Sequence, residues 1–185
     1  VYDYSGGLIE FGGDLLVGAD LSELWPSERL IEFELTPNRG DAFSALGVAR
    51  DLAAKLDLQL KHPAAGINIS DVDVADELSL RVEDAIACPR FTLQQIDGME
   101  VRPSPLWLQR RLAGLGLRPR NNVVDVTNYV TFELGQPSHA YDRNVLGDDT
   151  IIVRRAREDE RFTALNEREI ILTESDLVIT TPDGD

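Results

Sequence analysis

The sequence predicts an α+β fold, in which a small strand-helix segment at the N-terminus precedes a mixed α/β domain with a largely antiparallel sheet. Three observations support this prediction. Apolar and polar residues alternate with period two over residues 30–35, and apolar residues then recur at helical spacing over 42–56. Helix start and stop signals enclose residues 106–115, and apolar residues recur at helical spacing over 123–134. After residue 142, short β-type runs alternate with polar turns, as in an antiparallel sheet.

The first predicted strand covers residues 30–35, Leu-Ile-Glu-Phe-Glu-Leu, and ends in a turn over residues 36–41. Asp41 is the predicted cap of a helix over residues 42–56. Apolar residues recur along this helix at helical spacing, so they are predicted to face the core. This apolar stripe consists of Phe43, Leu46, Ala49, Leu52, Ala53 and Leu56.

A change of composition in the middle of the chain indicates a linker and a domain boundary. Residues 61–66, Lys-His-Pro-Ala-Ala-Gly, precede alternating isoleucine and valine residues, which predict an edge strand over 67–74. A further strand is predicted over 90–96. The glycine-rich opening of the chain looks like the tail of a larger unit.

Two helices and four strands are predicted after this point. Ser104 followed by proline is a strong helix start, so the first helix is predicted over 106–115 with Ser104 as its cap. The second, over 123–134, contains β-branched residues, but its valines recur at helical spacing and Gly135 follows as a C-cap. The strands are predicted over 150–154, 162–165, 169–172 and 177–180.

The composition narrows the classes of function. With 33 acidic and 18 basic residues among 185, the chain has a net charge of −15, which argues against non-specific binding to nucleic acid and against a DNA partner. One segment, 101–124, instead holds five arginines and no carboxylate. This basic segment is either a solvated helix face or a local contact for a polyanion.

Several kinds of site are not predicted. No apolar run is long enough to cross a bilayer and the first residues do not resemble a cleavable leader, which predicts a cytoplasmic protein without membrane contact. The single cysteine, Cys88, can form neither an internal disulfide nor a thiolate metal site. No phosphate-binding glycine loop is present, so no ATP chemistry is predicted in this segment. No metal site is predicted either, because His139 has no second histidine nearby and Asp142 alone completes too little of a coordination shell.

Residues 118–142 concentrate polar groups beyond what a core segment needs. If 123–134 is a helix, a hydroxyl, an amide and an imidazole (Thr127, Asn128 and His139) can line one small pocket and orient a water or a carbonyl group. They do not form a nucleophilic triad. A structural role stays open as well, with His139 bonded in its loop and Asp125, Thr127 and Asn128 satisfying the backbone.

Two motifs name a family. Residues 34–41, Glu-Leu-Thr-Pro-Asn-Arg-Gly-Asp, with 46–52, and residues 124–130, Val-Asp-Val-Thr-Asn-Tyr-Val, with 135–142, Gly-Gln-Pro-Ser-His-Ala-Tyr-Asp, closely resemble the β subunit of bacterial phenylalanyl-tRNA synthetase. The resemblance implies three parts. They are the end of an OB-type tRNA-binding module (1–29), a small helical B1-like segment (30–66), and a C-terminally incomplete B3/B4-type editing domain (67–185).

This resemblance also implies a function. The family enzyme is an (αβ)₂ heterotetramer that charges tRNA(Phe), and its α subunit handles ATP, magnesium and phenylalanine, so no cofactor is expected in this segment. The B3/B4 domain hydrolyses tyrosine wrongly attached to tRNA(Phe). The implied partners are therefore the α subunit and the 3′ end of tRNA(Phe).

By motif position, the implied editing pocket contains Arg118, Thr127, Asn128 and His139. Asn128 and Thr127 suit positioning of the amino acid or water, whereas Arg118 and His139 suit the tRNA 3′ end. His139 is also a candidate for assisting proton transfer, with Thr127 and Asn128 the other candidate catalytic residues. Family editing works largely by orienting water with help from the tRNA, so no strong base is required.

The chain departs from the family at several positions: Gly40 replaces proline, Ser138 methionine, Tyr141 phenylalanine, and Asn166-Glu167 an Asp-Gly turn. The family glutamate that reads the tyrosine hydroxyl comes after residue 185, so an inactive isolated fragment is one expectation. Two alternatives stay open. In the first, the chain is a non-catalytic scaffold that positions tRNA or docks the partner subunit. In the second, its parent protein has lost editing and kept the fold.

Overall fold

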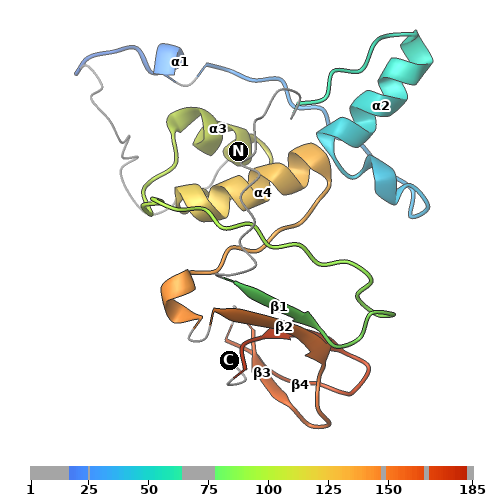
Figure 1. The fold of residues 1–185 in the computed structure, drawn as a ribbon. Helices are drawn as coiled ribbons and strands as arrows, with labels where there is room; N and C mark the ends of the chain where they lie inside the picture. The colour runs from blue at the N-terminus through green and yellow to red at the C-terminus, as the bar shows by residue number, and fades with distance from the viewer. Residues whose placement is uncertain (1–16, 25, 64–77, 147–148, 165–166, 183–185) are drawn as a thin grey trace. The chain divides into compact units, whose positions relative to one another are not determined.

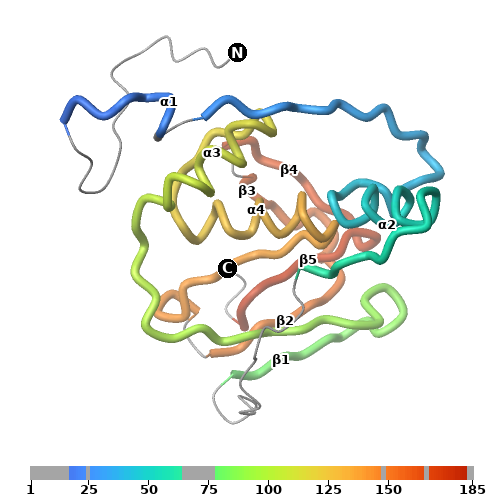
Figure 2. The backbone as a smooth tube through the Cα atoms, turned by 90° about the horizontal axis from the view of Figure 1, so that it is seen from above, coloured from blue at the N-terminus to red at the C-terminus, as the bar shows by residue number. Residues whose placement is uncertain are grey.

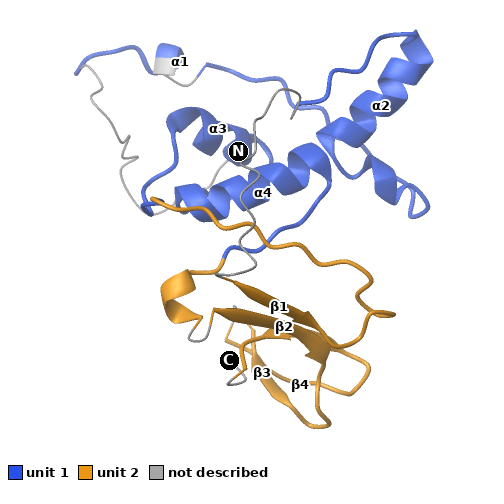
Figure 3. Cartoon of the chain, in the orientation of Figure 1, with its two compact units in different colours: residues 1–67, 99–140 blue, residues 68–98, 141–185 orange. Residues whose placement is uncertain are grey.

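The structure, a computed structural model, describes residues 17–24, 26–63, 78–146, 149–164 and 167–182 (Figure 1). Contacts divide the chain into two compact units, which are considered separately (Figure 3). Unit 1 comprises residues 1–67 and 99–140, and unit 2 comprises residues 68–98 and 141–185. The described α-helices all belong to unit 1 and the described strands to unit 2, which confirms the α+β class.

Unit 1 begins with three short elements: α1 (Leu21–Leu24), the 3₁₀ helix η1 (Gly40–Ala42) and α2 (Ala45–Leu56). The predicted turn before them is confirmed, because the Arg39 N–H donates to the Thr36 carbonyl at 3.0 Å. The predicted cap of α2 is wrong. Ser44 caps this helix by accepting a hydrogen bond from the Gly47 N–H at 2.9 Å, three residues on.

Asp41 lies instead in η1, where its carboxylate pairs with Arg39 at 2.9 Å. The helix therefore begins three residues later than predicted. The predicted core stripe is also largely exposed, since only its member Leu46 is buried to 9% exposure whereas Leu52 and Leu56 are 50% and 60% exposed. Only a part of α2 finds packing partners, and these are η1 and α4.

Two predicted strands are wrong. Residues 30–35 and 90–96 form no strand. Alternation favours an extended chain, but a strand needs a neighbour that accepts its backbone hydrogen bonds, and no described segment pairs with either one. The predicted strand over 67–74 and the boundary at residue 66 lie outside the described residues.

The two central helices are confirmed as α3 (Leu106–Gly114) and α4 (Asn122–Leu134), which lie side by side (Figure 2). The core of this helical pair is apolar, because Leu108 and Leu112 of α3 are 1% and 0% exposed. Gly135 ends α4 as predicted, with φ of 78° and its N–H donating to the Thr131 carbonyl. None of the helices described is long and apolar enough to cross a bilayer.

Ser104 does not cap α3, which corrects a further prediction. The N-cap is Pro105, which has no side chain that can accept a hydrogen bond. The Ser104 hydroxyl donates instead to the Asp125 carboxylate in α4 at 2.5 Å. A buried charged acceptor forms a stronger hydrogen bond than a helix N–H can, so the tertiary contact prevails over the local cap.

Unit 2 contains a mixed three-stranded sheet in the order β1-β2-β5 and a separate pair, β3-β4. β1 (Ser79–Val82) runs parallel to β2, whereas β2 with β5 and β3 with β4 are antiparallel. β2 is central and its middle is buried, with Ile151, Ile152 and Val153 at most 4% exposed. The four predicted strands are confirmed as β2 (Thr150–Arg155), β3 (Arg161–Thr163), β4 (Glu169–Ile171) and β5 (Leu177–Thr180). β1 was not predicted.

An ion pair closes the turn after β2. The Arg154 guanidinium donates two hydrogen bonds of 2.8 Å to the Glu160 carboxylate, and the Arg157 N–H donates a third at 2.7 Å. Chiefly because of the Arg154 hydrogen bond, and next because of the Arg157 N–H, the pKa of Glu160 falls from an ordinary value of 4.5 to about 2.

Acid should therefore weaken unit 2 through Glu160. Since its pKa is lower in the folded protein than in the unfolded one, the stabilisation is complete above about pH 4.5 and is lost as the pH falls toward about 2. In Glu160→Gln, we expect the free energy of unfolding to fall less steeply over this range. Urea titrations at several pH values from 5 to 2 measure the slope of the unfolding free energy against pH. The control is Glu158→Gln, which changes an exposed glutamate close to Glu160 in the sequence. Parallel curves for the original protein and Glu160→Gln would contradict this assignment.

Candidate functional site

The predicted site residues all belong to unit 1 and are arranged along α4. Thr127 and Asn128 lie in the middle of this helix, Arg118 precedes it, and His139 follows its C-cap. A helix of 13 residues is about 20 Å long. Arg118 and His139 thus leave opposite ends of α4, and their convergence with the two central residues on one pocket stays a prediction.

The beginning of α4 is held by its own side chains. The Asn121 amide oxygen accepts hydrogen bonds from the Val123 and Val124 N–H groups at 3.1 and 3.0 Å. These donors have no partner within the helix, so Asn121 satisfies the helix terminus. Its amide oxygen is therefore committed to the fold.

Asn122 is committed to the fold as well. Its amide oxygen accepts from the Arg102 N–H at 2.9 Å, and its amide nitrogen donates to the Glu100 carbonyl at 2.9 Å. Its backbone N–H also donates to the Arg102 carbonyl at 2.8 Å. One residue thus ties the segment before α3 to the first turn of α4.

Asp125 is a fully buried carboxylate, with 0% exposure. One oxygen accepts from the Ser104 hydroxyl at 2.5 Å and the other from the Arg120 N–H at 2.9 Å. A buried carboxylate is stable only when such donors compensate for lost water. For Asp125, the structural role left open by the sequence is therefore confirmed.

The Thr127 hydroxyl is partly occupied. It donates to the Val124 carbonyl one turn earlier, at 2.8 Å. Because its only hydrogen is used within the helix, the oxygen is left with the capacity to accept a hydrogen bond from a ligand but not to donate one. Thr127 is therefore suited to an amino group or a water molecule as its partner.

The Asn128 amide has a different position. It is half-buried, and no hydrogen bond joins its side chain to another described residue. An amide offers two donor hydrogens and one acceptor oxygen. Among the polar side chains of α4 described above, Asn128 is thus the one whose donors and acceptor all stay available to a ligand.

Arg118 and His139 are exposed, which suits contact with a large ligand rather than with a buried one. The basic segment is less uniform than its sequence suggests. Arg110 and Arg111 lie 3.0 and 3.9 Å from the Glu28 carboxylate, and Arg102 pairs with Glu100. Within the described residues, Arg118 and Arg120 form no ion pair, so the positive charge left for a polyanion is concentrated just before α4.

An aromatic contact between the helices was not predicted. The rings of Trp107 in α3 and Tyr129 in α4 meet edge to face, with centroids 5.6 Å apart at 87°. The Tyr129 hydroxyl donates to the Glu133 carboxylate at 2.7 Å, and this hydrogen bond raises the pKa of Tyr129. The spacing of four residues between Tyr129 and Glu133 was the available sequence signal.

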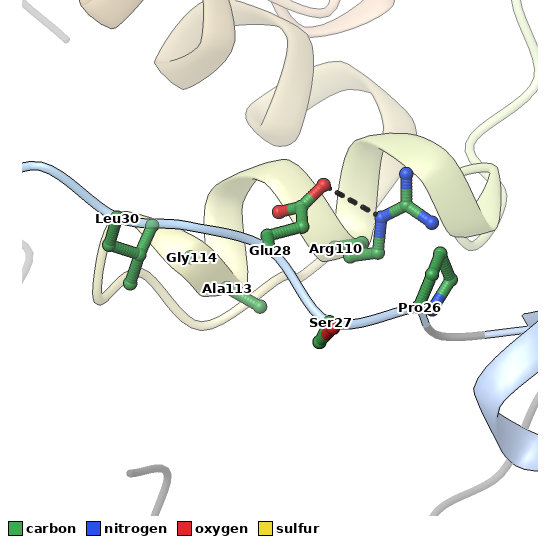
Figure 4. A pocket seen from close by; sticks show the side chains of 7 residues that line it. All are labelled: Pro26, Ser27, Glu28, Leu30, Arg110, Ala113 and Gly114. Carbon is green, nitrogen blue, oxygen red and sulfur yellow. Dashed lines mark ion pairs between the residues drawn. The ribbon is translucent and has the colours of Figure 1, made fainter.

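A shallow pocket of about 170 Å³ lies elsewhere in unit 1, between the segment 26–30 and α3 (Figure 4). The Arg110 Nε lies 3.0 Å from the Glu28 carboxylate along its wall, but its N–H does not point at the oxygen, so the contact is an ion pair without a hydrogen bond. None of the four predicted site residues lines this pocket. Across the part of the chain that the structure describes, no group of three or more metal-binding side chains is found.

The sequence model of one protein family, the B3/4 domain, matches residues 87–185, which include α3, α4 and every described strand except β1. The chain belongs to the B3/4 domain family. The match thus spans the candidate residues Arg118, Thr127, Asn128 and His139. The three predicted domains and their boundaries stay predictions.

Curated relatives agree with this assignment. The chain is 45% identical over 176 residues to the phenylalanine--tRNA ligase beta subunit of Geobacter metallireducens, a match covering 95% of this chain and 22% of the relative. The subunits of the same name from Bacillus licheniformis and Bacillus subtilis are 42% and 40% identical over 179 residues, covering 96% of this chain and 22% of each relative. The chain therefore spans about a fifth of the length of these relatives. The resemblance identified from the two motifs is confirmed.

Proposed function

We propose that this chain is part of a phenylalanyl-tRNA synthetase β subunit and that its B3/4 segment contributes to hydrolysis of mischarged Tyr-tRNA(Phe). Similarity to named β subunits over 95–96% of the chain supports the first part. The half-buried Asn128 amide supports the second, because its donors and acceptor stay available and because the preceding Thr127 hydroxyl keeps its capacity to accept a hydrogen bond. The same subunit contributes to charging of tRNA(Phe) through the complete enzyme.

A separate hydrolytic site has a physical reason. Tyrosine exceeds phenylalanine by one hydroxyl group, and an apolar pocket rejects an added hydroxyl by only about a hundredfold. A second, polar site that accepts the hydroxyl and cleaves the ester raises accuracy beyond that limit. Such a site needs groups that orient an ester and a water molecule, and it needs no metal.

The residues divide this work by their chemistry. Thr127 accepts a hydrogen bond from the substrate amino group or from water, and Asn128 donates to the ester carbonyl or orients the attacking water. Water adds to the carbonyl carbon, the bond to the ribose oxygen breaks, and that oxygen takes the proton that water loses. Free tyrosine and tRNA with an intact 3′ end result, with His139 near the leaving ribose.

The remaining partners follow from the same proposal. The chain acts in the cytoplasm as part of an (αβ)₂ enzyme, and the α subunit of this enzyme handles ATP and magnesium. Arg118 and His139, both exposed, contact the 3′ end of tRNA(Phe). Neither DNA nor a membrane is a proposed partner.

Single-turnover deacylation of Tyr-tRNA(Phe) tests the proposal, with Phe-tRNA(Phe) as control. The complete enzyme should clear the tyrosine ester selectively, and His139→Ala should slow this about fivefold, because loss of one polar contact costs about 1 kcal/mol. If neither enzyme clears the ester, the segment is a scaffold. If both clear it equally, editing stands but His139 has no part in it.

A scaffold function is the second candidate, and one observation favours it. The side chains of Asn121, Asn122 and Asp125 are all used to hold unit 1 together. If Thr127 and Asn128 serve the same purpose, their loss lowers the melting temperature and leaves the deacylation rate of the folded enzyme unchanged. A slower rate with unchanged melting favours editing.

Arg118 provides a separate prediction about tRNA. If its guanidinium contacts one phosphate of the single-stranded 3′ end, Arg118→Ala should weaken binding and reduce the slope of log affinity against log salt by about 0.7. Binding titrations of tRNA(Phe) between 50 and roughly 200 mM salt measure the slope. Arg111→Ala, which removes an exposed arginine from α3, is the matched control. An unchanged slope in Arg118→Ala would refute the contact.

A further inference from the structure

We propose that Asp125 is a positioning residue, which holds the segment carrying Arg118 against α4 and so determines where the Arg118 guanidinium lies relative to Thr127 and Asn128. This inference rests on the proposed function. Asp125 touches no substrate in this proposal, because it is fully buried and both its oxygens are occupied. It acts through the hydrogen bond that it accepts from the Arg120 backbone N–H.

The segment around Arg118 has two backbone anchors. On one side, the Leu117 N–H donates to the Leu112 carbonyl of α3 at 3.0 Å. On the other side, the Arg120 N–H donates to Asp125 of α4 at 2.9 Å. Arg118 and Pro119 lie between these anchors, and proline restricts the backbone further. Loss of the Asp125 anchor frees one end of this short span.

The two anchors belong to the two helices, so the Arg118 backbone is placed by the packing of α3 on α4. Asp125 is also three residues before Asn128, which brings the two residues to the same side of α4. The hydrogen bond to Asp125 thus sets the position of the exposed Arg118 relative to the half-buried Asn128 amide, which lies one turn after Asp125. Fixing both groups before the ligand arrives reduces the ordering that binding requires.

Three variants separate positioning from stability. Asp125→Ala removes both hydrogen bonds. Asp125→Asn can keep both, since its oxygen accepts from the Arg120 N–H while its nitrogen donates to the Ser104 hydroxyl. Ser104→Ala removes only the hydrogen bond between Ser104 and Asp125. It leaves the hydrogen bond from the Arg120 N–H to Asp125, and so the Arg118 segment stays anchored.

The test is single-turnover deacylation of Tyr-tRNA(Phe) by the complete enzyme, as a function of enzyme concentration. We expect Asp125→Ala to raise the half-saturating concentration about tenfold, which is the effect of losing one charge-assisted contact between a displaced Arg118 and the tRNA. Asp125→Asn should keep the half-saturating concentration of the original enzyme. Ser104→Ala should lower the melting temperature but leave the half-saturating concentration unchanged. In an Arg118→Ala background, Asp125→Ala should add no further increase. A full additional tenfold increase in that background overturns the proposal.

Amide hydrogen exchange gives a readout that needs no substrate. In Asp125→Ala, exchange in peptides covering residues 116–121 should accelerate at least tenfold, while the interior of α4 stays protected. Equal acceleration throughout α3 and α4 means a general loss of stability and overturns the anchor. Failure of the proposed function gives a different pattern of results. Asp125→Ala would still accelerate amide exchange in residues 116–121, whereas Asn128→Ala would leave hydrolysis of the tyrosine ester unchanged.

Discussion

Replacement of Asn128 by alanine is expected to slow single-turnover hydrolysis of Tyr-tRNA(Phe) by about a hundredfold, the usual effect of removing one donor that stabilises charge at a reacting carbonyl. The reason lies in its environment. The amide is half-buried, where hydrogen bonds are stronger than in water, and no described residue uses it. Its loss removes an interaction with the reacting ester and breaks no side-chain hydrogen bond to another described residue.

The matched control is Thr131→Ala, one turn further along α4. The Thr131 hydroxyl donates to the Thr127 carbonyl at 2.9 Å, so its removal perturbs the helix without taking a group from the proposed site. Both variants should melt within a few degrees of the original enzyme, and only Asn128→Ala should lose activity. Equal rates in all three enzymes would exclude Asn128 from the reaction.

The second large effect concerns stability, in a comparison of two helical glycines. A methyl group added at Gly47 of α2 would lie 2.1 Å from the Asp41 carbonyl oxygen and 2.8 Å from the Ala42 Cα atom. Both are backbone atoms of η1 and cannot rotate away. Although alanine favours helix by about 1 kcal/mol over glycine, we expect Gly47→Ala to lower the free energy of unfolding by at least about 2 kcal/mol.

Gly114 at the end of α3 is the matched control. There the added methyl group would lie 3.3 Å from the Leu30 Cδ2 atom, at the end of a flexible side chain that can move. Gly114→Ala should therefore change the free energy of unfolding by less than about 1 kcal/mol. Urea denaturation of both variants decides, and a Gly47→Ala protein as stable as Gly114→Ala would contradict the close packing of η1 on α2.

Local signals predicted the elements that depend on local interactions. Helical spacing together with Gly135 correctly predicted α4 despite its β-branched residues, because the αL conformation of a C-cap is a property of glycine itself. Short β-type runs predicted β2 to β5 within a few residues. The two motifs also identified the family, since a motif is read directly from residue order.

Predictions that required a partner were less successful. The alternating segment 30–35 forms no strand, since no described segment pairs with it, and the apolar stripe of α2 is largely exposed. For the caps, Asp41 and Ser104 were both chemically suitable. Each instead found a stronger partner, Arg39 for Asp41 and Asp125 for Ser104, and only the second of these is distant in sequence.

The sequence by itself determined the helices α3 and α4, the main strands, the family, and the residue types that the candidate site offers. Only the tertiary structure decided which of those polar groups are occupied. Asn121, Asn122 and Asp125 bond within unit 1, whereas the Asn128 amide does not. The physical reason is that a polar side chain satisfies its hydrogen bonds with whatever the fold brings near it, and residues such as Ser104 and Asp125 meet only once α3 and α4 have packed.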